Sequence, residues 1–407
     1  MLSKKNSPKG FGSTAIHSGH QQDGNNAHLT PIYASSTYVF DSAEQGMRRF
    51  NGEEKGYIYS RWGNPTMAEA EDKISALEGF GIMKNGEPIQ LKSILHASGM
   101  AAISALLLAT LKAGDKILSH FSLYGGTQEL MEKVLPPLGI EVIIVDLRDL
   151  NKAEDALKKD AKIKMLYLET PANPTIQCVD IDELTKLAKR NSLLVAVDNS
   201  FATPYLQQPF KYDVDFVFHS TTKFLNGHGT AIGGVIVGKD MDFMHGRMQK
   251  VHRLLGGNSN PFDAFLLTQG MKTLEVRMER HCANAMKVAA FLEKNKSVSK
   301  VNYLGLASHP DYATAKKQMS HPGAMLSFEL KDGLEAGKKF INKLEMCVRA
   351  VSLGTCDTLL SHPASMTHFG VPKEKREQYG ITDGLIRMSV GIENIDDILN
   401  DLGQALN

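Results

Sequence analysis

Residues 216–229 read FVFHSTTKFLNGHG. The run up to His219 is apolar and aromatic, which predicts a short buried β-strand that ends at that residue. Three hydroxyl residues and then Lys223 follow the strand directly. A lysine in this position is expected to be partly desolvated, which lowers the pKa of its amine and suits it to Schiff-base chemistry. A loop lysine among capping hydroxyls would have the same pattern, so the ends of the neighbouring strands must decide between the two.

Six further runs with strand composition surround this one, and most alternate with segments of helical spacing such as 100–111 and 181–189. Strands that alternate with helices predict parallel pairing with crossover helices. Runs such as VIIV and LLVAV are apolar throughout, as expected for strands covered on both faces. The sequence therefore predicts an α/β fold whose large domain holds a seven-stranded, mostly parallel sheet. The other six predicted strands are 93–97, 116–120, 141–146, 164–168, 193–198 and 232–237.

The pattern of apolar and polar residues changes on both sides of this regular region. Residues 1–60 lack a clear period but carry several aromatic residues, which favours an extended N-terminal arm packed on a neighbouring subunit. Residues 61–255 form the predicted large α/β domain. A long helical stretch, 261–294, then precedes shorter strands, which predicts a smaller C-terminal α+β domain over 256–407. The strands predicted in that domain are 323–330, 350–353 and 385–389.

The 407 residues are 42% hydrophobic and 22% charged, with a formal net charge of +1. This balance is typical of soluble globular proteins and creates no field that would attract nucleic acid or an acidic membrane surface. No apolar stretch approaches the ~20 residues of a membrane span, and no apolar segment follows the basic start, so we expect neither a membrane span nor a secretory signal. The four cysteines are scattered without a C-x-x-C pair, so we predict no metal site and a cytoplasmic location.

Small and aromatic residues follow two of the predicted strands. Ser98, Gly99 and Met100 lead directly into a helix, and the free N–H groups and dipole of a helix N-terminus favour a bound anion. Ordinary capping by Ser98 is the alternative at this position. After the next strand, Tyr124 is followed by two glycines, so its ring can stack on a flat ligand while the backbone comes close.

Polar residues follow three more strands. Glu169 ends one strand, and Asn173 comes soon after it between two prolines, which hold its amide in a stiff loop. Asp198 ends an apolar strand, where a carboxylate is costly unless it has a partner such as a protonated pyridine nitrogen. Ser220 and Thr222 can bind a phosphate beside the lysine. A phosphate site, an aromatic stack, a buried carboxylate and an amine together match the functional groups of pyridoxal 5′-phosphate (PLP), which are a phosphate, a flat ring, a pyridine nitrogen and an aldehyde.

Eight specific motifs extend this pattern along the chain: YSRWGNPT at 59–66, SGM at 98–100, YGGT at 124–127, ETPANP at 169–174, VDNS at 197–200, HSTTK at 219–223, SLG at 352–354 and LIRMSVG at 385–391. With these motifs the chain resembles the Cys/Met-metabolism group of PLP enzymes from His17 to about Gln404. That group contains methionine and cystathionine γ-lyases, cystathionine γ-synthase and β-lyase, and homoserine-ester sulfhydrylases. The resemblance implies fold-type I architecture, PLP as cofactor and an amino acid as substrate.

The resemblance also implies a role for individual residues. Lys223 would carry the cofactor as a Schiff base and later move protons, while Asp198 would pair with the pyridine nitrogen. Tyr124 would stack on the cofactor ring. Tyr59 and Arg61 would complete the phosphate site from the neighbouring subunit, which makes a homodimer obligatory and a tetramer expected. The other residues implied in cofactor binding are Ser98, Gly99, Met100, Glu169, Asn173, Ser220 and Thr222.

For the substrate, the resemblance implies that Arg387 binds the carboxylate bidentately, which suits a planar guanidinium. Ser352 and Asn173 would assist at the carboxylate and the ring hydroxyl, and Val351 would line the substrate site. The implied reaction removes the Cα proton and then the γ-substituent. It ends either in addition of a nucleophile at Cγ or in release of a 2-oxo acid and ammonia. The implied catalytic set is Lys223, Tyr124, Tyr59 and Arg387.

Two positions bear on which member of the group the chain resembles. Gly126 argues against a methionine γ-lyase, because the methionine γ-lyases that we would compare carry Cys there. Val351 stands where cystathionine enzymes tend to carry Glu, and an apolar side chain suits a small uncharged substituent. Segments 227–234 and 261–265 look more like O-acetylhomoserine sulfhydrylases, whereas 363–368 and 379–384 look like methionine γ-lyase.

We rank γ-elimination on methionine or homocysteine first, O-acetylhomoserine or O-succinylhomoserine sulfhydrylation second, and cystathionine γ-lyase or γ-synthase third. A PLP-binding protein without turnover is the alternative from a different class. Such a relative could lose Arg387 or Tyr59, and the chain has both. The glycine-rich turns lack a G-x-G-x-x-G or P-loop pattern, so nucleotide binding is not indicated.

Overall fold

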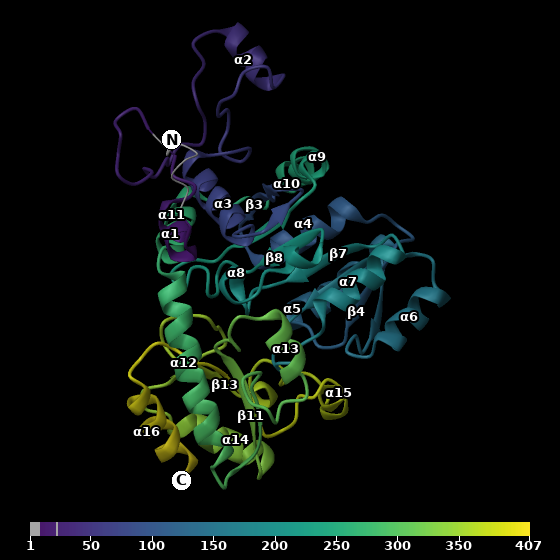
Figure 1. Ribbon diagram of the computed structural model, residues 1–407, viewed down its shortest axis with the longest axis vertical. Helices are drawn as coiled ribbons and strands as arrows, with labels where there is room; N and C mark the ends of the chain where they lie inside the picture. Colours follow the sequence, from purple (N-terminus) through teal and green to yellow (C-terminus); the bar gives the residue numbers. More distant parts are fainter. Residues whose placement is uncertain (1–8, 22) are drawn as a thin grey trace.

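Seven strands form the central sheet, in the order β3-β9-β8-β7-β6-β4-β5, in a computed structural model that describes residues 9–21 and 23–407 (Figure 1). All adjacent pairs are parallel except those made by β9, which is antiparallel to β8 and β3. The predicted seven-stranded, mostly parallel sheet is thus confirmed. The strands are β3 (Lys92–His96), β4 (Lys116–His120), β5 (Glu141–Val145), β6 (Ile163–Glu169), β7 (Leu194–Asp198), β8 (Phe216–His219) and β9 (Gly234–Gly238).

Strand β9 reverses direction because no crossover helix lies between it and β8. Residues 220–233 form a loop of turns, and a strand that returns without a crossover pairs antiparallel to the strand before it. The four parallel strands on the other side of β8 are joined by segments that contain helices. Since β8 is parallel to them, its carboxyl end and the loop with Lys223 lie at the same edge of the sheet as the ends of β4, β6 and β7.

Alternate residues of the buried strands pack into two cores, one on each face of the sheet. Leu95 and Val197 belong to the core made with α3, α7 and α11. Ile94 and Ala196 belong to the core made with α4. Both faces are covered, as the apolar strand sequences predicted. The helices of this part are α3 (Pro65–Glu78), α4 (Gly99–Thr110), α5 (Gly125–Glu129), α6 (Leu150–Lys159), α7 (Ile181–Arg190), α8 (Thr203–Leu206), α9 (Met241–Phe243), α10 (Gln249–Leu255) and α11 (Pro261–Met271).

A second sheet of five strands follows, in the order β10-β11-β14-β13-β12. Its apolar face packs on α12, α14 and α16 in a third core, and α12 runs along one side of the molecule between the two sheets (Figure 1). The strands are β10 (Val298–Asn302), β11 (Met325–Leu330), β12 (Val348–Arg349), β13 (Leu359–Ser361) and β14 (Leu385–Ser389); the helices are α12 (Leu274–Glu293), α13 (Tyr312–Gln318), α14 (Gly333–Lys343), α15 (Lys373–Gln378) and α16 (Ile395–Leu406).

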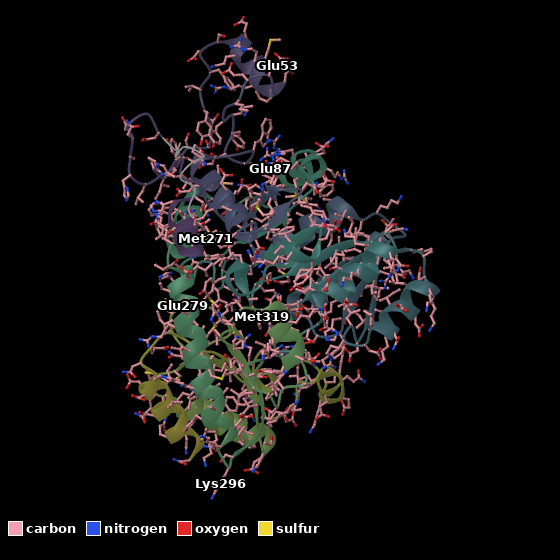
Figure 2. The ribbon with its side chains drawn as sticks, viewed as in Figure 1. Glu53, Glu87, Met271, Glu279, Lys296 and Met319 are labelled. Atoms are coloured by element: carbon pink, nitrogen blue, oxygen red, sulfur yellow. The ribbon has the colours of Figure 1, made fainter. Side chains whose placement is uncertain are left out.

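Two predictions for this region are wrong in detail. The stretch 261–294 is two helices, and Figure 2 labels Met271 and Glu279 on either side of the break. The carbonyl of Gly270 accepts hydrogen bonds from the side chains of Thr273 at 3.1 Å and Arg277 at 2.8 Å, so these side chains replace the helical partners. Residues 350–353, which were predicted to be a strand, instead belong to the loop between β12 and β13.

The N-terminal segment has two parts. Helix α1 (Phe11–His17) packs against the body, with the ring of Phe11 5.5 Å from that of Phe80. The buried Nζ of Lys73 donates to the carbonyls of Ala15 at 2.9 Å and Ser18 at 2.6 Å, which ties down the end of this helix. Helix α2 (Ala43–Phe50) instead stands away from the body (Figure 1). The short hairpin of β1 (Met83–Lys84) and β2 (Glu87–Pro88) follows α3.

Residues 1–8 and 22 lie outside the described residues. They include part of the predicted arm and most of the basic start on which the absence of a secretory signal was predicted. No helix among the described residues is long and apolar enough to cross a membrane.

Candidate active site

A cavity of about 790 Å³ lies beyond the carboxyl ends of β4, β6, β7 and β8, and loops of the small sheet close it from the other side. Two of the predicted site residues, Tyr59 and Arg61, do not line it. The cavity brings together predicted residues that are up to 289 positions apart in the sequence, from Ser98 to Arg387. The predicted residues that line the cavity are Ser98, Gly99, Met100, Tyr124, Glu169, Asn173, Asp198, Ser220, Thr222, Lys223, Val351, Ser352 and Arg387.

Lys223 presents its amine at the centre of this arrangement. The Nζ atom donates a hydrogen bond of 3.1 Å to the hydroxyl of Ser352, which lies in the loop between β12 and β13. Burial lowers the pKa of the amine to about 8, the positive charge of Arg387 adds to the lowering, and Asp198 opposes it. A free amine is therefore accessible near neutral pH, as a nucleophilic lysine requires.

Two buried carboxylates end neighbouring strands, Asp198 on β7 and Glu169 on β6. Burial raises the pKa of Asp198, while hydrogen bonds from Ser200 and the charges of His219 and Lys223 oppose the rise. The backbone N–H of Ser200 donates to Oδ1 of Asp198 at 2.9 Å. Because burial still raises the pKa of this carboxylate, a cationic partner in the cavity would stabilise its charged form.

A cradle for an anion lies where β3 leads into α4. Ser98 caps this twelve-residue helix by accepting from the N–H of Ala101, so the capping alternative is correct for its side chain. The N–H groups of the first helical turn still point outward, as at any helix N-terminus. Ser220 lies directly opposite, because a Cβ atom added to Gly99 would come within 3.3 Å of its Oγ atom. Glycine at position 99 therefore lets the start of α4 pack closely against Ser220, and both residues line the cavity.

Arg387 lies on β14 with its side chain almost fully buried. One guanidinium nitrogen donates to the carbonyls of Val351 at 2.9 Å and Ser352 at 2.8 Å, and the other donates to Oδ1 of Asn173 at 3.2 Å. Residues 350–353 therefore do not form a strand, because these carbonyls bind the guanidinium. The Nε atom is buried and has no hydrogen-bond partner among the described residues. Burial lowers the pKa of Arg387 to about 10, so it remains a cation at neutral pH.

Tyr124 precedes α5, and half of its surface is exposed towards the cavity. Gly126 packs directly under its ring, because an added Cβ atom would lie 2.7 Å from Cε1 of Tyr124 and 3.2 Å from Sδ of Met100. Position 126 therefore favours glycine in this chain, because the ring of Tyr124 occupies the space that a larger side chain would need.

Tyr59 and Arg61 lie together at the base of the arm. The guanidinium carbon of Arg61 is 5.5 Å from the centre of the Tyr59 ring, and the side chain also donates to the carbonyl of Arg253. Neither residue lines the cavity of its own chain. The structure of a single chain thus separates them from the other predicted cofactor residues.

Sequence reasoning did not single out several residues that belong to the site or support it. Ser200 binds Asp198 and stands in the quoted VDNS motif, so the signal was present. His368 lines the outer part of the cavity, and burial lowers the pKa of its imidazole. Glu78 and His219 form a fully buried pair at 2.5 Å behind the end of β8. They come from distant parts of the sequence, so no local pattern could have paired them.

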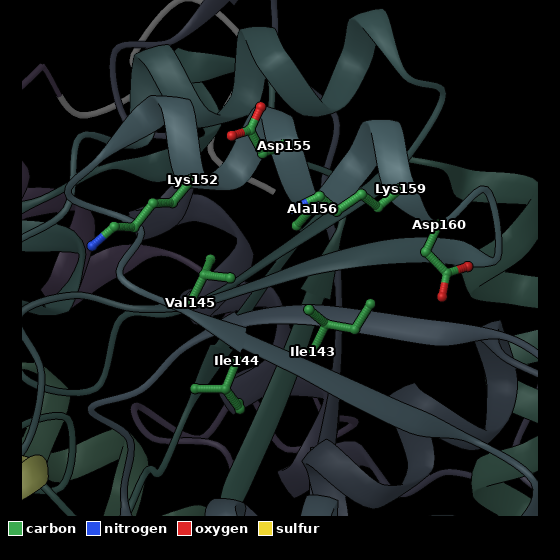
Figure 3. A pocket seen from close by; sticks show the side chains of 8 residues that line it. All are labelled: Ile143, Ile144, Val145, Lys152, Asp155, Ala156, Lys159 and Asp160. Atoms are coloured by element: carbon green, nitrogen blue, oxygen red, sulfur yellow. The ribbon is translucent and has the colours of Figure 1, made fainter.

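A second hollow of about 590 Å³ lies between the edge strand β5 and helix α6 (Figure 3). It shares no lining residue with the cavity, and none of the predicted site residues lies there. Its lining is Ile143, Ile144, Val145, Lys152, Asp155, Ala156, Lys159 and Asp160. Among the described residues, no group of three or more His, Cys, Asp or Glu side chains has the arrangement of a metal site.

The cavity fits PLP on structural grounds. The N-terminus of α4 with the hydroxyls of Ser220 and Thr222 suits a phosphate, the buried Asp198 suits a protonated ring nitrogen, and the amine of Lys223 suits the aldehyde. The guanidinium of Arg387, which lines the cavity and stays cationic at neutral pH, suits the carboxylate of an amino acid beside the cofactor.

Comparison with known proteins agrees with this fit. Residues 12–407 match the model of the family described as Cys/Met metabolism PLP-dependent enzyme. The chain is 50% identical to an L-methionine gamma-lyase of Fusobacterium nucleatum subsp. nucleatum, over 98% of both chains. It is 43% identical to a cystathionine beta-lyase of Lactococcus lactis subsp. cremoris, over 96% of this chain and 97% of the other.

The fold agrees as well. The crystal structure of a cystathionine gamma synthase from Xanthomonas oryzae pv. oryzae, in complex with aminoacrylate and cysteine, matches with a TM-score of 0.90 and 35% identity, over 98% of both chains. The resemblance drawn from the motifs is thereby confirmed. The chain belongs to the Cys/Met-metabolism family of PLP-dependent enzymes, with the fold-type I architecture of that family.

Proposed function

We propose that the chain catalyses γ-elimination on L-methionine, in which methionine and water give 2-oxobutanoate, ammonia and methanethiol. The similarity over nearly the whole chain to a methionine γ-lyase supports the choice of substrate. The buried guanidinium of Arg387, which lines the same cavity as Lys223, is the observation that supports amino-acid binding. Gly126 is weaker evidence against this activity than the sequence alone indicated. The ring of Tyr124 occupies the space of a side chain at this position, which gives a steric reason for the glycine.

Arg387 would bind the carboxylate of the substrate through its guanidinium. The carbonyls of Val351 and Ser352 hold the guanidinium plane fixed, so the substrate would meet a preorganised fork. Val351 is more than half exposed and lines the cavity, which suits the uncharged side chain of methionine. Asn173 would lie beside both the cofactor and this fork.

Lys223 would act as the base that takes the proton from Cα once the substrate has displaced it from the cofactor. Its pKa of about 8 allows the amine to accept and return a proton near neutral pH. The bound cofactor supplies an electron-withdrawing ring, whose nitrogen Asp198 would keep protonated. Tyr124 would cover the ring and complete the catalytic set with Lys223, Arg387 and a partner's Tyr59. The phosphate would lie between the start of α4 and the side chains of Ser220 and Thr222.

The position of Tyr59 and Arg61 outside the cavity supports a site shared between two copies of the chain. The arm that carries them exposes large apolar side chains, among them Val39 at 88%, Met47 at 65% and Phe50 at 59%. Exposed apolar groups of this size favour burial against a partner. We therefore propose a homodimer in which each arm completes the neighbouring site, a tetramer built from two such dimers, and a cytoplasmic location. The proposed domains remain 1–60, 61–255 and 256–407, although α11 packs into the core of the large sheet.

An activity panel tests the proposal against its alternatives. The purified holoenzyme would receive methionine, homocysteine, cystathionine and O-acetylhomoserine, each with and without sulfide. 2-Oxobutanoate from methionine without sulfide is the expected result. Homocysteine formed only from the ester plus sulfide would replace elimination with sulfhydrylation, which segments 227–234 and 261–265 favour. Turnover of cystathionine alone would move the assignment to a cystathionine lyase: cysteine and 2-oxobutanoate would indicate the γ-lyase, and homocysteine and pyruvate the β-lyase activity of the Lactococcus relative.

A further inference from the structure

Glu169 is a buried carboxylate for which the proposed reaction has no step. It ends β6 in register with Asp198 on β7, and the two side chains are 4% and 8% exposed. The ring nitrogen of the cofactor needs only one of these carboxylates. Two adjacent buried carboxylates repel each other, so the second is retained at a cost in stability and needs a reason.

The first reason lies at Tyr124. The Oε2 atom of Glu169 accepts a hydrogen bond of 2.7 Å from the backbone N–H of Tyr124. This N–H belongs to the loop between β4 and α5, where no strand ladder supplies an acceptor. The side chain of Tyr124 is half exposed in the cavity, so its ring position follows from the position of its backbone.

The second reason lies at Asn173. The other oxygen, Oε1, accepts a hydrogen bond of 3.0 Å from the backbone N–H of Asn173. The side-chain oxygen of Asn173 in turn accepts a hydrogen bond of 3.2 Å from Arg387. One oxygen of this carboxylate thus binds the backbone of Tyr124. The other binds the backbone of Asn173, whose side chain contacts the guanidinium of Arg387.

The hydrogen bonds also indicate the ionisation state that the arrangement needs. Burial and the charge of Asp198 raise the pKa of Glu169, while the two backbone N–H groups oppose the rise. One donor on each oxygen is the pattern of an ionised carboxylate, because a protonated acid keeps only one good acceptor oxygen. Both loops are therefore held most firmly when Glu169 is charged, because each oxygen is then a full acceptor.

Building on the proposed function, we propose that Glu169 is a positioning residue that holds the ring of Tyr124 and the Asn173–Arg387 pair in fixed register across the active site. It touches neither the substrate nor the reacting atoms in this role. Its carboxylate sets the distance between the part of the site that covers the cofactor and the part that binds the substrate carboxylate.

The test compares Glu169→Gln with Asp401→Asn in the holoenzyme. Gln has the same shape but only one acceptor oxygen, so one of the two loops loses its anchor. Asp401 is a matched control, because its buried carboxylate accepts from the backbone N–H groups of Glu345, Met346 and Cys347, far from the cavity. The measurements are thermal stability, visible absorption and visible circular dichroism of the bound PLP, and kcat and KM for methionine.

We expect both variants to lose thermal stability. Only Glu169→Gln should lose kcat/KM, by about 10- to 100-fold, which is the range for removal of a hydrogen bond to a charged group. It should keep the visible absorption band, since Lys223 is intact, but lose part of the visible circular dichroism because the ring of Tyr124 shifts. Glu169→Asp keeps the charge and should show a smaller loss, so it replaces Glu169→Gln if that variant does not fold.

A double-mutant cycle with Arg387→Lys tests the connection through Asn173. The double variant should lose less than the product of the two single losses, because both changes act on one unit. Independent losses would contradict the connection. If Glu169→Gln keeps the kcat/KM and circular dichroism of Asp401→Asn, Glu169 has a structural role alone and the inference fails. If the wild-type protein shows no visible PLP band, the proposed function fails instead.

Discussion

The Nζ atom of Lys223 lies 3.1 Å from the hydroxyl of Ser352. The lysine follows the large sheet, and the serine belongs to the loop before β13 of the small sheet. The same serine offers its carbonyl to Arg387 at 2.8 Å. One residue of the small sheet therefore contacts both the amine that would hold the cofactor and the cation that would hold the substrate.

Replacement of the lysine tests the covalent role of Lys223. Lys223→Ala should fold and can still bind PLP, but it should lack the visible band of lysine-bound cofactor. Activity should fall by about 100- to 10,000-fold or more, the range for removal of a general acid–base group. The exposed Lys250→Ala serves as the control and should keep both the band and the activity. Normal turnover by Lys223→Ala would refute the assignment.

The pH dependence of cofactor uptake tests the environment of Lys223. Only the free amine attacks an aldehyde, so the rate at which the cofactor-free protein binds PLP should rise with pH through about 8 and then level off. Arg387→Met removes a positive charge, which favours the ammonium form and should move the midpoint to higher pH. Arg387→Lys keeps the charge and should leave the midpoint near that of the wild type. A midpoint that is the same in Arg387→Met and the wild type would contradict the coupling.

Substitution of Arg387 also tests carboxylate binding. Arg387→Lys replaces a planar fork by a point charge and should raise KM for methionine, with a loss in kcat/KM of about 10- to 100-fold. Methioninamide, which lacks the carboxylate, should be processed poorly by the wild type and with little further loss by the variant. Arg190→Lys on the surface is the control. Equal losses on methionine and its amide would argue that Arg387 acts elsewhere.

Mixing of inactive chains tests the shared site. If Tyr59 and Arg61 serve the neighbouring subunit, a heterodimer of Lys223→Ala and Arg61→Ala chains contains one intact site and should regain activity after the chains are mixed. Lys223→Ala mixed with Asp198→Ala is the control and should stay inactive, because Lys223 and Asp198 line the same cavity of one chain. Lack of recovery in the first mixture, with exchange of subunits demonstrated, would exclude a site shared in this way.

A glycine substitution tests how the loop after Lys223 is held. Gly227 has a positive φ of 72°, and an added Cβ atom would overlap the guanidinium of Arg277, which donates to the carbonyl of Phe224 at 2.9 Å. Gly227→Ala should destabilise the protein by at least about 1 kcal/mol and weaken PLP binding. Gly246→Ala is the control, because an added Cβ atom meets no atom within 4 Å there. Equal melting temperatures for the two variants would contradict this account.

The sequence predicts the large sheet well because its strands are buried on both faces. Six of the seven predicted strands begin and end within one residue of those observed, and β8 and β4 agree at both ends. The reversed direction of β9 follows from the missing crossover helix between it and β8. The break between α11 and α12 depends on Arg277, whose contact with Gly270 has no local signal.

The cavity could be predicted only in part. Residues that end neighbouring strands, such as Asp198 and Lys223, are brought together by the topology of the sheet alone. The loop at 350–353 is apolar and β-branched enough to predict a strand, yet its carbonyls turn to Arg387, a tertiary contact with a residue on β14. In the proposed dimer Tyr59 and Arg61 would serve the site of the second copy, a position for which a single sequence gives no geometric signal.

The most direct test of the account is the product ratio from methionine alone. Purified wild-type protein with bound PLP would be incubated with L-methionine in the absence of sulfide, and 2-oxobutanoate, ammonia and methanethiol would be measured together. The account predicts equal amounts of all three, formed at least about 100-fold more slowly by Lys223→Ala. Absence of 2-oxobutanoate from methionine, while O-acetylhomoserine and sulfide give homocysteine, would contradict it.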